Sequence, residues 1–498
     1  MTVVIAGAGP TGITLACELA RRGVACRVLE KAPTLFEGSR GKGISPRTQE
    51  VFRDLGVLDR MLADGMPFPK FRLYAGHDVV SERTAGELLG VQLPQHSAEI
   101  PYPEILLLPQ WRTDEILFER LRELGGQVEF DTEVTGFDQD EDGVTVHTSA
   151  GPIRASHLIG CDGGRSRLRK ALGVGFAGET LETERTIIGD ARADGLEGVF
   201  CHMFTRAGDV GERFSLWNLP GGEYYQFVAT MASEQVPALT LEEMNRLLRE
   251  RSGRDDLRLH GLRWISLYRV NVRMVDRYRV GRVLLAGDAA HVHSGASGQG
   301  MNTSVQDAYN LGWKLAAVLS GAPDELLDSY EAERMPVAAN VLGVSTRLHR
   351  LNFQSSSEPV AVHQLDVNYR GGPLAVEERR TPGRLRAGDR APDGLLADGT
   401  RLFDLFRGTH FTLLAFGRRP EGEFGRGVRV HRAAKSEGYD VDGDALVLVR
   451  PDGYVGVVSD RADTVRDYLE RVTGDGSEAD HVPTVPSPAL SVHDTSSN

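Results

Sequence analysis

A glycine-rich turn near the start of the chain has the residue types needed to hold a phosphate-bearing nucleotide. The run Gly7-Ala-Gly9-Pro-Thr-Gly12 follows an apolar strand and opens a helix. In such a turn Gly7 permits the bend, Gly9 lets a pyrophosphate approach the backbone, and Gly12 lets helix and strand pack closely. The helix N-terminus, at Pro10 and Thr11, stabilises the phosphate charge. The turn therefore predicts a dinucleotide site.

An acidic residue at the end of the next expected strand refines this prediction. Glu30 lies 18 residues after Gly12 and is followed by Lys31, which we include in the same site. The Glu30 carboxylate would accept hydrogen bonds from both hydroxyls of an adenosine ribose, and it disfavours a 2′-phosphate. The pattern therefore indicates FAD or NAD rather than NADP. A glycine-rich turn without a ligand is the alternative, and the strand, the helix and the acid together argue against it.

Two further motifs stand at the ends of expected strands. The first is Gly160-Cys-Asp162-Gly163. The second is Gly287-Asp288-Ala-Ala-His291, and it is followed by Gly298-Gln-Gly300-Met301-Asn302, which opens a helix. A carboxylate beside a glycine-flanked helix start suits a polyol ligand, because the carboxylate binds hydroxyls and the helix dipole stabilises an anion.

These three motifs, in this order, resemble the class A flavoprotein monooxygenases with the para-hydroxybenzoate hydroxylase fold. The most similar branch contains polyketide-tailoring aromatic hydroxylases and rifampicin-type monooxygenases. The resemblance implies non-covalent FAD, with NAD(P)H as a transient reductant. It places Asp288, with Gly287, at the FAD ribitol, and Asp162 in a motif linked to both FAD and NAD(P)H. The residues that it places at the pyrimidine edge of the isoalloxazine are Gly298, Gly300, Met301 and Asn302.

The resemblance also assigns residues outside the three motifs. Arg40, in Ser39-Arg40-Gly41-Lys42-Gly43, matches a basic residue near the flavin and the pyrophosphate. Gln110 and Arg112 match further FAD contacts. The chain departs from the family at Gly295, where proline is frequent, and at Ser297, where glycine is frequent. A looser loop is expected there, beside the reactive edge of the flavin.

The fold class expected is α/β with an added antiparallel sheet: a Rossmann-like FAD domain, a substrate-binding sheet and a thioredoxin-like C-terminal domain. The FAD domain is expected to be discontinuous, over 1–70, 100–175 and 275–350. The sheet domain is expected over 71–99 and 176–274. The remaining segments are an irregular linker over 352–385, the thioredoxin-like domain over 386–475 and a disordered tail over 476–498.

The C-terminal likeness rests on Gly388–Pro392 and Leu448–Gly453, and it is weaker. All four cysteines precede residue 202, so this domain has no dithiol chemistry available. A structural or dimerising role is expected for it.

Composition limits the partners. The charge is 57 − 70 = −13, and an acidic chain without a basic block is a poor ligand for nucleic acid or an anionic membrane. No apolar run is long and uninterrupted enough to span a bilayer, so a cytoplasmic protein is expected. His291 and His293 lack acidic or cysteine neighbours at metal spacing, so no metal is expected. The partners expected are an aromatic small molecule and O₂, with a homodimer left open.

The resemblance implies that NAD(P)H reduces FAD and that O₂ then gives a C4a-hydroperoxyflavin, which transfers oxygen to an electron-rich aromatic carbon. The flavin carries this chemistry, so no side chain is assigned as acid or base. A bulky polycyclic, polyketide-like substrate is expected, in contact with Gly295 and with the aromatic residues Trp217, Tyr224 and Phe227. The alternatives left open are Baeyer–Villiger oxygenation, a flavin dehydrogenase or reductase, and a nucleotide-binding scaffold without catalysis.

Overall fold

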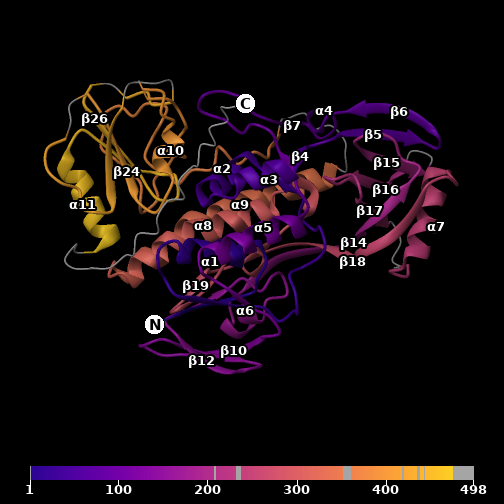
Figure 1. The fold of residues 1–498 in the computed structure, drawn as a ribbon, viewed down its shortest axis with the longest axis horizontal. Helices are drawn as coiled ribbons and strands as arrows, with labels where there is room; N and C mark the ends of the chain where they lie inside the picture. Colours follow the sequence, from indigo (N-terminus) through magenta and orange to yellow (C-terminus); the bar gives the residue numbers. More distant parts are fainter. Residues whose placement is uncertain are drawn as a thin grey trace, which may run out of the picture.

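The computed structural model describes residues 2–206, 209–231, 237–351, 360–396, 398–417, 420–433, 438–441 and 443–474. The expected disordered tail, 476–498, lies outside these residues. Figure 1 shows a central body of helices and a parallel sheet, an extended antiparallel sheet at one end, and a separate C-terminal sheet at the other. The mixed α/β architecture with an added antiparallel sheet is therefore confirmed.

The central sheet is built from short apolar runs. β1 (Val3–Ala6) is buried throughout and pairs in parallel with β2 (Cys26–Leu29) and β13 (His157–Gly160). The other strands are β9 (Val128–Glu129), β20 (Val283–Leu285) and β19 (Arg279–Val280), in the order β19-β20-β13-β1-β2-β9. Only β19 is antiparallel to its neighbour. In sheets of this kind, ligands bind at the carboxyl ends of the strands.

Four helices of the central body pack against this sheet or against one another. α1 (Pro10–Ala20) begins directly after the glycine turn and contacts α5 (Gln110–Glu123) and α8 (Gly300–Leu319). α9 (Asp328–Leu351), with Pro336 inside it, contacts α8. The shorter helices are α2 (Pro46–Leu55), α3 (Leu58–Asp64), α4 (Ala85–Leu89) and α6 (Arg167–Leu172), with the 3-10 turns η1 (Gly287–Ala289), η2 (Gly295–Ser297) and η3 (Asp324–Leu327).

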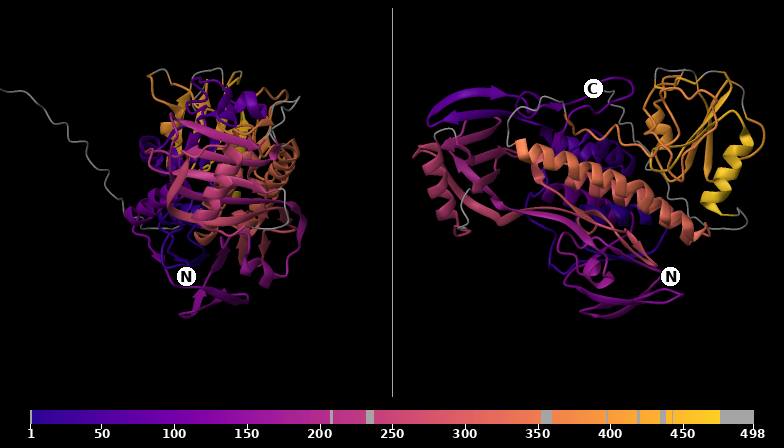
Figure 2. Two further views of the ribbon diagram at one scale, coloured as in Figure 1. Left: turned by 90° about the vertical axis from the view of Figure 1, so that its right-hand side faces the viewer. Right: turned by 180° about the vertical axis from the view of Figure 1, so that it is seen from behind.

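The antiparallel body is an eight-stranded sheet, and α7 (Leu241–Ser252) covers one of its faces. Its strands, in spatial order, are β21 (His291–Val292), β18 (Arg258–Val275), β14 (Phe176–Asp194), β17 (Tyr225–Met231), β16 (Asp209–Asn218), β15 (Phe200–Arg206), β5 (Lys70–Ala75) and β6 (Asp78–Arg83). The sheet is antiparallel except where β15 pairs in parallel with β5. β14 and β18 are 19 and 18 residues long, and Figure 2 shows them running from the central body into this sheet. They therefore connect the two bodies through continuous strands.

Small sheets complete the central part of the molecule. They are β10 (Val134–Gln139), β11 (Val144–Thr148) and β12 (Gly151–Ala155) in one meander, β3 (Gly43–Ile44), β8 (Leu106–Leu107) and β4 (Met66–Pro67) in another, and the pair β22 (Val360–Ala361) and β7 (Val91–Gln92). β22 falls inside the expected irregular linker, as does a strand of the C-terminal sheet at 376–377. The linker prediction over 352–385 is therefore wrong for these two segments, because each pairs with a strand far away in sequence.

The C-terminal domain has the order β23-β27-β26-β24-β25. Its elements are β23 (Val376–Glu377), α10 (Leu402–Phe406), β24 (Phe411–Phe416), β25 (Val428–Ala433), β26 (Ala445–Val449), β27 (Val455–Ser459) and α11 (Ala462–Thr473). β24, β26 and β27 are buried along their whole length, and α10 and α11 contact the sheet.

Buried charges fasten this domain to the central helices. The Arg450 guanidinium, in the turn after β26, donates to Glu333 of α9 at 2.6 and 2.9 Å and also to Asp452. Lys314 of α8 donates to the same Glu333 at 2.7 Å, and the Trp313 indole donates to Asp452 at 3.0 Å. Burial by itself would raise the pKa of Glu333, but Arg450 and Lys314 lower it to about 2. The domain is thus an integral part of the body that carries α8.

We expect Arg450→Met to lower the free energy of unfolding by about 3–5 kcal/mol, because two buried carboxylates lose the cation that they share. Chemical denaturation followed by circular dichroism measures this. The matched control is Arg466→Met on α11, where the exposed pair with Asp463 is worth less than about 1 kcal/mol. Equal stability of both variants would show that the C-terminal domain is only loosely attached.

Candidate active site

The glycine turn is closed on one side and open on the other. A Cβ on Gly7, whose φ is 105°, would lie 2.4 Å from the Cys161 carbonyl oxygen, and a Cβ on Gly12 would lie 2.0 Å from the Gly7 oxygen. A Cβ on Gly9 would meet nothing within 4 Å. The turn therefore presents an unobstructed backbone beside the N-terminus of α1, where Pro10 is the first helical residue. This is the geometry that a pyrophosphate needs.

The Glu30 carboxylate is held beside this turn. It accepts hydrogen bonds from the backbone N–H groups of Ala8 and Ala32, both at 2.9 Å. These bonds fix an acidic group next to the opening above Gly9. Lys31, the next residue, is exposed.

Asp288 is an exposed residue of η1, the segment that packs against the start of α1. Gly287 has a φ of 61°, and a Cβ there would lie 2.7 Å from the Thr11 hydroxyl, so η1 packs directly against α1. Solvent reaches the Asp288 side chain, yet the protein around it raises the pKa of its carboxyl by desolvation, which His291 and Arg40 partly offset. A carboxylate that is enclosed but accessible suits the hydroxyl groups of a ligand.

A buried ion pair positions the η1 segment. Asp307, on α8, contacts His291 Nε2 at 2.6 Å and accepts from the Gly287 N–H at 3.2 Å. Arg334 of α9 donates to its other oxygen at 2.7 Å. Arg334 and His291 outweigh desolvation and lower the pKa of Asp307. Sequence reasoning missed Asp307 and Arg334, although a carboxylate on the buried face of a helix is itself a signal of a paired charge.

The N-terminus of α8 carries the other predicted flavin residues. Gly298 has a φ of 64° and open space where a Cβ would be, and Gly300 lies beside the ring of His293. The Met301 sulfur would lie 3.3 Å from a Cβ on Gly41, so this helix start touches the loop that carries Arg40.

Asn302 uses its amide group to bind that same loop. Its oxygen accepts from the Ser45 N–H at 2.8 Å, and its nitrogen donates to the Gly43 oxygen at 2.9 Å. The side chain is 1% exposed. It thus positions residues 43–45 against α8 and has little surface left for a ligand.

A residue from the expected linker completes this network. Gln364, with a φ of 60° and 3% exposure, donates to Gln299 at 3.2 Å and to Thr303 at 3.0 Å. It also accepts from Gln306 at 2.7 Å and from Ser45 at 3.1 Å. Nothing in the local sequence marks Gln364, because its partners come from 58 or more residues away.

The remaining predicted cofactor residues are in different environments. The Arg40 guanidinium lies 4.8 Å from the Phe36 ring centroid, and Gln110 accepts from the Gly41 N–H at 3.2 Å. Asp162 accepts from two N–H groups at the start of α6. Arg112 pairs with Asp64 at 2.7 Å and with Glu115 at 3.0 Å. The structure therefore brings Gln110 to the loop of Arg40, while the Arg112 side chain is engaged by carboxylates of α3 and α5.

The predicted substrate residues lie in different parts of the structure. Trp217 is partly exposed and lies 5.3 Å from the Phe68 ring and 5.1 Å from the Phe71 ring. The ring of Phe227 is fully buried in a core cluster that includes residues of α7, and we therefore place it outside the substrate site. Tyr224 lies near Arg192 and Arg263, on the loop before β17. Gly295, in η2, is exposed with open space around it.

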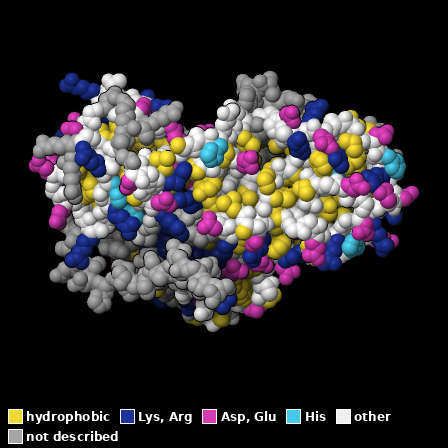
Figure 3. Space-filling view, turned by 45° about the horizontal axis from the view of Figure 1, so that its top comes forward, with side chains coloured by type: hydrophobic (Ala, Val, Ile, Leu, Met, Phe, Trp, Pro, Cys, Tyr) yellow, Lys and Arg dark blue, Asp and Glu magenta, His cyan; other side chains and the backbone are white. Residues whose placement is uncertain are grey.

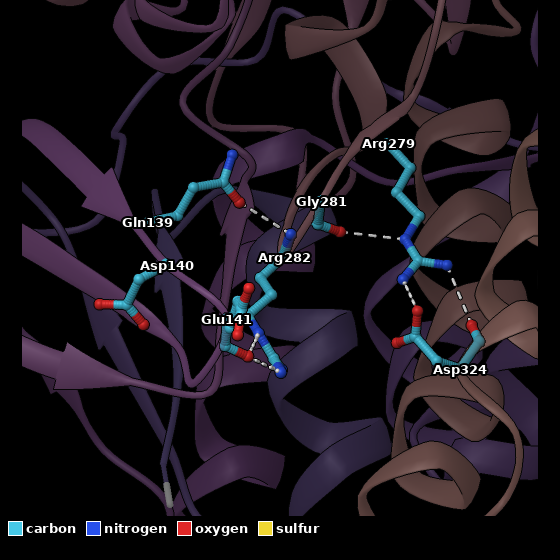
Figure 4. Close-up of a pocket in the computed structure, with 7 residues that line it drawn as sticks. All are labelled: Gln139, Asp140, Glu141, Arg279, Gly281, Arg282 and Asp324. Carbon is cyan, nitrogen blue, oxygen red and sulfur yellow. Dashed lines mark hydrogen bonds and ion pairs between the residues drawn. The ribbon is translucent and has the colours of Figure 1, made fainter.

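A polar cleft is lined by residues of other segments, and none of them belongs to the predicted cofactor or substrate site. Figure 4 shows its residues: Arg279 pairs with Asp324, the Arg282 guanidinium donates to the Glu141 carbonyl, and the Arg282 backbone N–H donates to the Gln139 side-chain oxygen. Within the described residues, no group of three or more His, Cys, Asp or Glu side chains is placed to hold a metal ion. In the same part of the chain, no helix has the length and apolar character to cross a bilayer. On the face in Figure 3, both signs of charge are interspersed.

The site residues fit an FAD. An acid beside an open glycine turn suits the adenosine and pyrophosphate end, and an accessible carboxylate followed by a glycine-bounded helix start suits the ribitol and the ring.

Comparison with known proteins supports this fit. Residues 1–345 match the family model described as an FAD binding domain, and residues 385–476 match that of the aromatic-ring hydroxylase C-terminal domain. A flavin-dependent monooxygenase of Mycobacteroides abscessus is 64% identical over 95% of this chain and 100% of its own. A 12-dehydrotetracycline 5-monooxygenase/anhydrotetracycline 6-monooxygenase of Streptomyces rimosus is 36% identical over 91% of this chain and 94% of its own.

Solved structures agree with the family matches. An anhydrotetracycline hydroxylase from Streptomyces rimosus has a TM-score of 0.75 at 32% identity, over 96% of this chain and 100% of its own. An aklavinone-11 hydroxylase in complex with FAD and aklavinone has a TM-score of 0.79 at 27% identity, over 95% and 98%. The chain therefore belongs to the FAD-dependent aromatic-ring monooxygenases, the class that its three motifs resemble.

Proposed function

We propose that this enzyme hydroxylates a bulky polycyclic phenol of the polyketide type, with NAD(P)H as the transient reductant and O₂ as the oxygen source. The observation that carries this proposal is the set of groups left available to a ligand: the Glu30 carboxylate held beside the glycine turn, the open space at Gly9 and Gly298, and the exposed Asp288 carboxylate. Relatives that match 91% and 95% of this chain are named for tetracycline-type and aklavinone substrates, which supports a polycyclic ligand.

We propose roles for the chain's own residues in this set. Glu30 binds the adenosine ribose, the turn at Gly9 and the N-terminus of α1 bind the pyrophosphate, and Asp288 binds the ribitol. Gly298 leaves room for the ring beside the start of α8, whose dipole favours negative charge. FAD, when bound, supplies the redox and oxygen-transfer chemistry. The protein supplies orientation and electrostatics, and Trp217 offers an aromatic surface on the sheet.

An oxygen-labelling experiment tests the reaction class. We expect a multi-ring phenol or quinone, such as anhydrotetracycline, to accelerate NAD(P)H oxidation and to gain one oxygen atom from ¹⁸O₂, as read by mass spectrometry. Para-hydroxybenzoate is the control and should do neither. A ring-expanded lactone of the same mass would favour Baeyer–Villiger oxygenation. Oxidation of a substrate without any oxygen gain would favour a dehydrogenase.

Replacing Gly9 tests the pyrophosphate assignment. We expect Gly9→Val to lose most bound FAD while keeping its fold, because the side chain fills the space that a Cβ finds empty in the structure. The flavin-to-protein absorbance ratio after purification measures this. Gly343→Val, on the exposed side of α9, is the matched control with equally open surroundings. Full FAD content in Gly9→Val would refute the assignment.

Replacing Asp288 tests the ribitol assignment. Asp288→Ala should weaken FAD binding by about 1.5–3 kcal/mol, the worth of a charge-assisted hydrogen bond. Fluorescence titration of the apoprotein with FAD gives the dissociation constant. Asp78→Ala, at an exposed position on β6, serves as the control. An unchanged dissociation constant would place the ribitol elsewhere.

A further inference from the structure

One row of side chains crosses the antiparallel sheet on a single face. The strand register pairs Asp190 of β14 with Gln226 of β17, Gln226 with Trp217 of β16, Trp217 with Cys201 of β15, and Cys201 with Phe71 of β5. Directly paired residues share a face of a sheet. Phe227, one residue along β17, points to the opposite face, toward α7.

A loop of the central body lies against this row. The Ser39 hydroxyl donates to Asp190, and the Gln226 amide nitrogen donates to Ser39. The Lys42 ammonium donates to the Gln226 oxygen at 2.5 Å and lies 4.2 Å from the centroid of the Trp217 ring. Lys42 is therefore a cation that the central body extends to the face of the sheet.

Among the described residues, no carboxylate forms an ion pair with Lys42, although its ammonium group is largely desolvated. Burial lowers the pKa of Lys42 to about 8, and the smaller effects of Cys201 and Asp190 only partly offset this. Gln226 satisfies one of its three N–H donors, and the side chain stays partly exposed. A desolvated ammonium that keeps free donors and some access to solvent is suited to bind an anionic oxygen.

The position of Lys42 joins the two halves of the proposed site. Its neighbour Gly41 lies against Met301, and its other neighbour Gly43 is bound by Asn302. Both of these partners belong to the start of α8, where we place the flavin ring. Lys42 thus lies between that helix start and Trp217.

We propose that Lys42 binds an ionised phenolic oxygen of the polycyclic substrate, with the substrate's ring system against Trp217. This inference rests on the proposed function and specifies its substrate as one that reacts in the phenolate form. Neither Lys42 nor its partners belong to the glycine and carboxylate motifs of the cofactor site.

The proton transfer balances without another reagent. When Lys42 is neutral, the phenolic O–H bond breaks, the amine takes the proton, and the electron pair stays on oxygen. When Lys42 is already protonated, the phenolic proton goes to solvent. Either route leaves an ammonium–phenolate pair. The oxyanion donates electron density into the ring, which makes the carbons ortho and para to it more reactive toward an electrophilic oxygen.

A spectroscopic titration tests this inference without turnover. Alizarin, a tricyclic dihydroxyanthraquinone, absorbs at longer wavelength when it loses a phenolic proton, and anhydrotetracycline is a second probe. We expect the oxidised holoenzyme to lower the apparent pKa of bound alizarin by about one to three units, as a nearby opposite charge does. Lys42→Met should abolish this shift and weaken binding about tenfold at neutral pH, while Lys42→Arg should retain the shift.

The control is Lys70→Met, since Lys70 is exposed on β5 next to Phe71 and points to the other face. FAD content and melting temperature show that each variant is folded. If Lys42 only braces its loop, Lys42→Met will lose FAD or stability but will bind alizarin as the anion, which overturns the inference and leaves the proposed function standing. If neither probe binds the wild-type enzyme, the proposed function itself fails.

Discussion

The whole site depends on a close approach of three chain segments at the carboxyl edge of the central sheet. Gly7 touches the backbone after β13, Gly12 touches Gly7, and Gly287 touches Thr11. A methyl group at any of these three glycines would overlap a neighbouring atom. Because the segments after β1, β13 and β20 converge there, the open turn at Gly9 and the accessible Asp288 carboxylate lie in segments that pack directly against each other. Side chains at these glycines would force the strand ends apart.

Helix α8 transmits this arrangement through the molecule. Its first turn binds the loop at Ser45 through Asn302, its middle holds the η1 segment through Asp307, and its last turns carry Lys314, which shares a buried carboxylate with Arg450 of the C-terminal domain. Buried charges of this kind are costly unless each has its partner. The C-terminal domain therefore contributes to the placement of α8.

The sequence allowed prediction of the parts of the site that depend on local pattern. The helix from Met301 and the strand–turn–helix at Gly9 follow from periodicity and glycine spacing, and the family followed from the order of the motifs. The sequence could not reveal the roles of Gln364, Asp190 or Gln226, because these roles arise from strand register and from contacts between residues far apart in the chain. Alternation along β17 shows that neighbouring residues face opposite ways, but only the packing of α7 determines which face is covered.

The division of labour between the two bodies follows from these contacts. Loop 39–43 belongs to the central body, yet Ser39 and Lys42 both bind Gln226 of the sheet, so hydrogen bonds hold this loop against the sheet. The row on the sheet comes from five different strands, whereas the glycine turn is continuous in sequence. Substitutions at Trp217 or its neighbours can therefore alter the surface offered to a substrate while the contacts that hold α8 and the glycine turn remain in place. This separation is a physical basis on which one cofactor scaffold can serve many aromatic substrates.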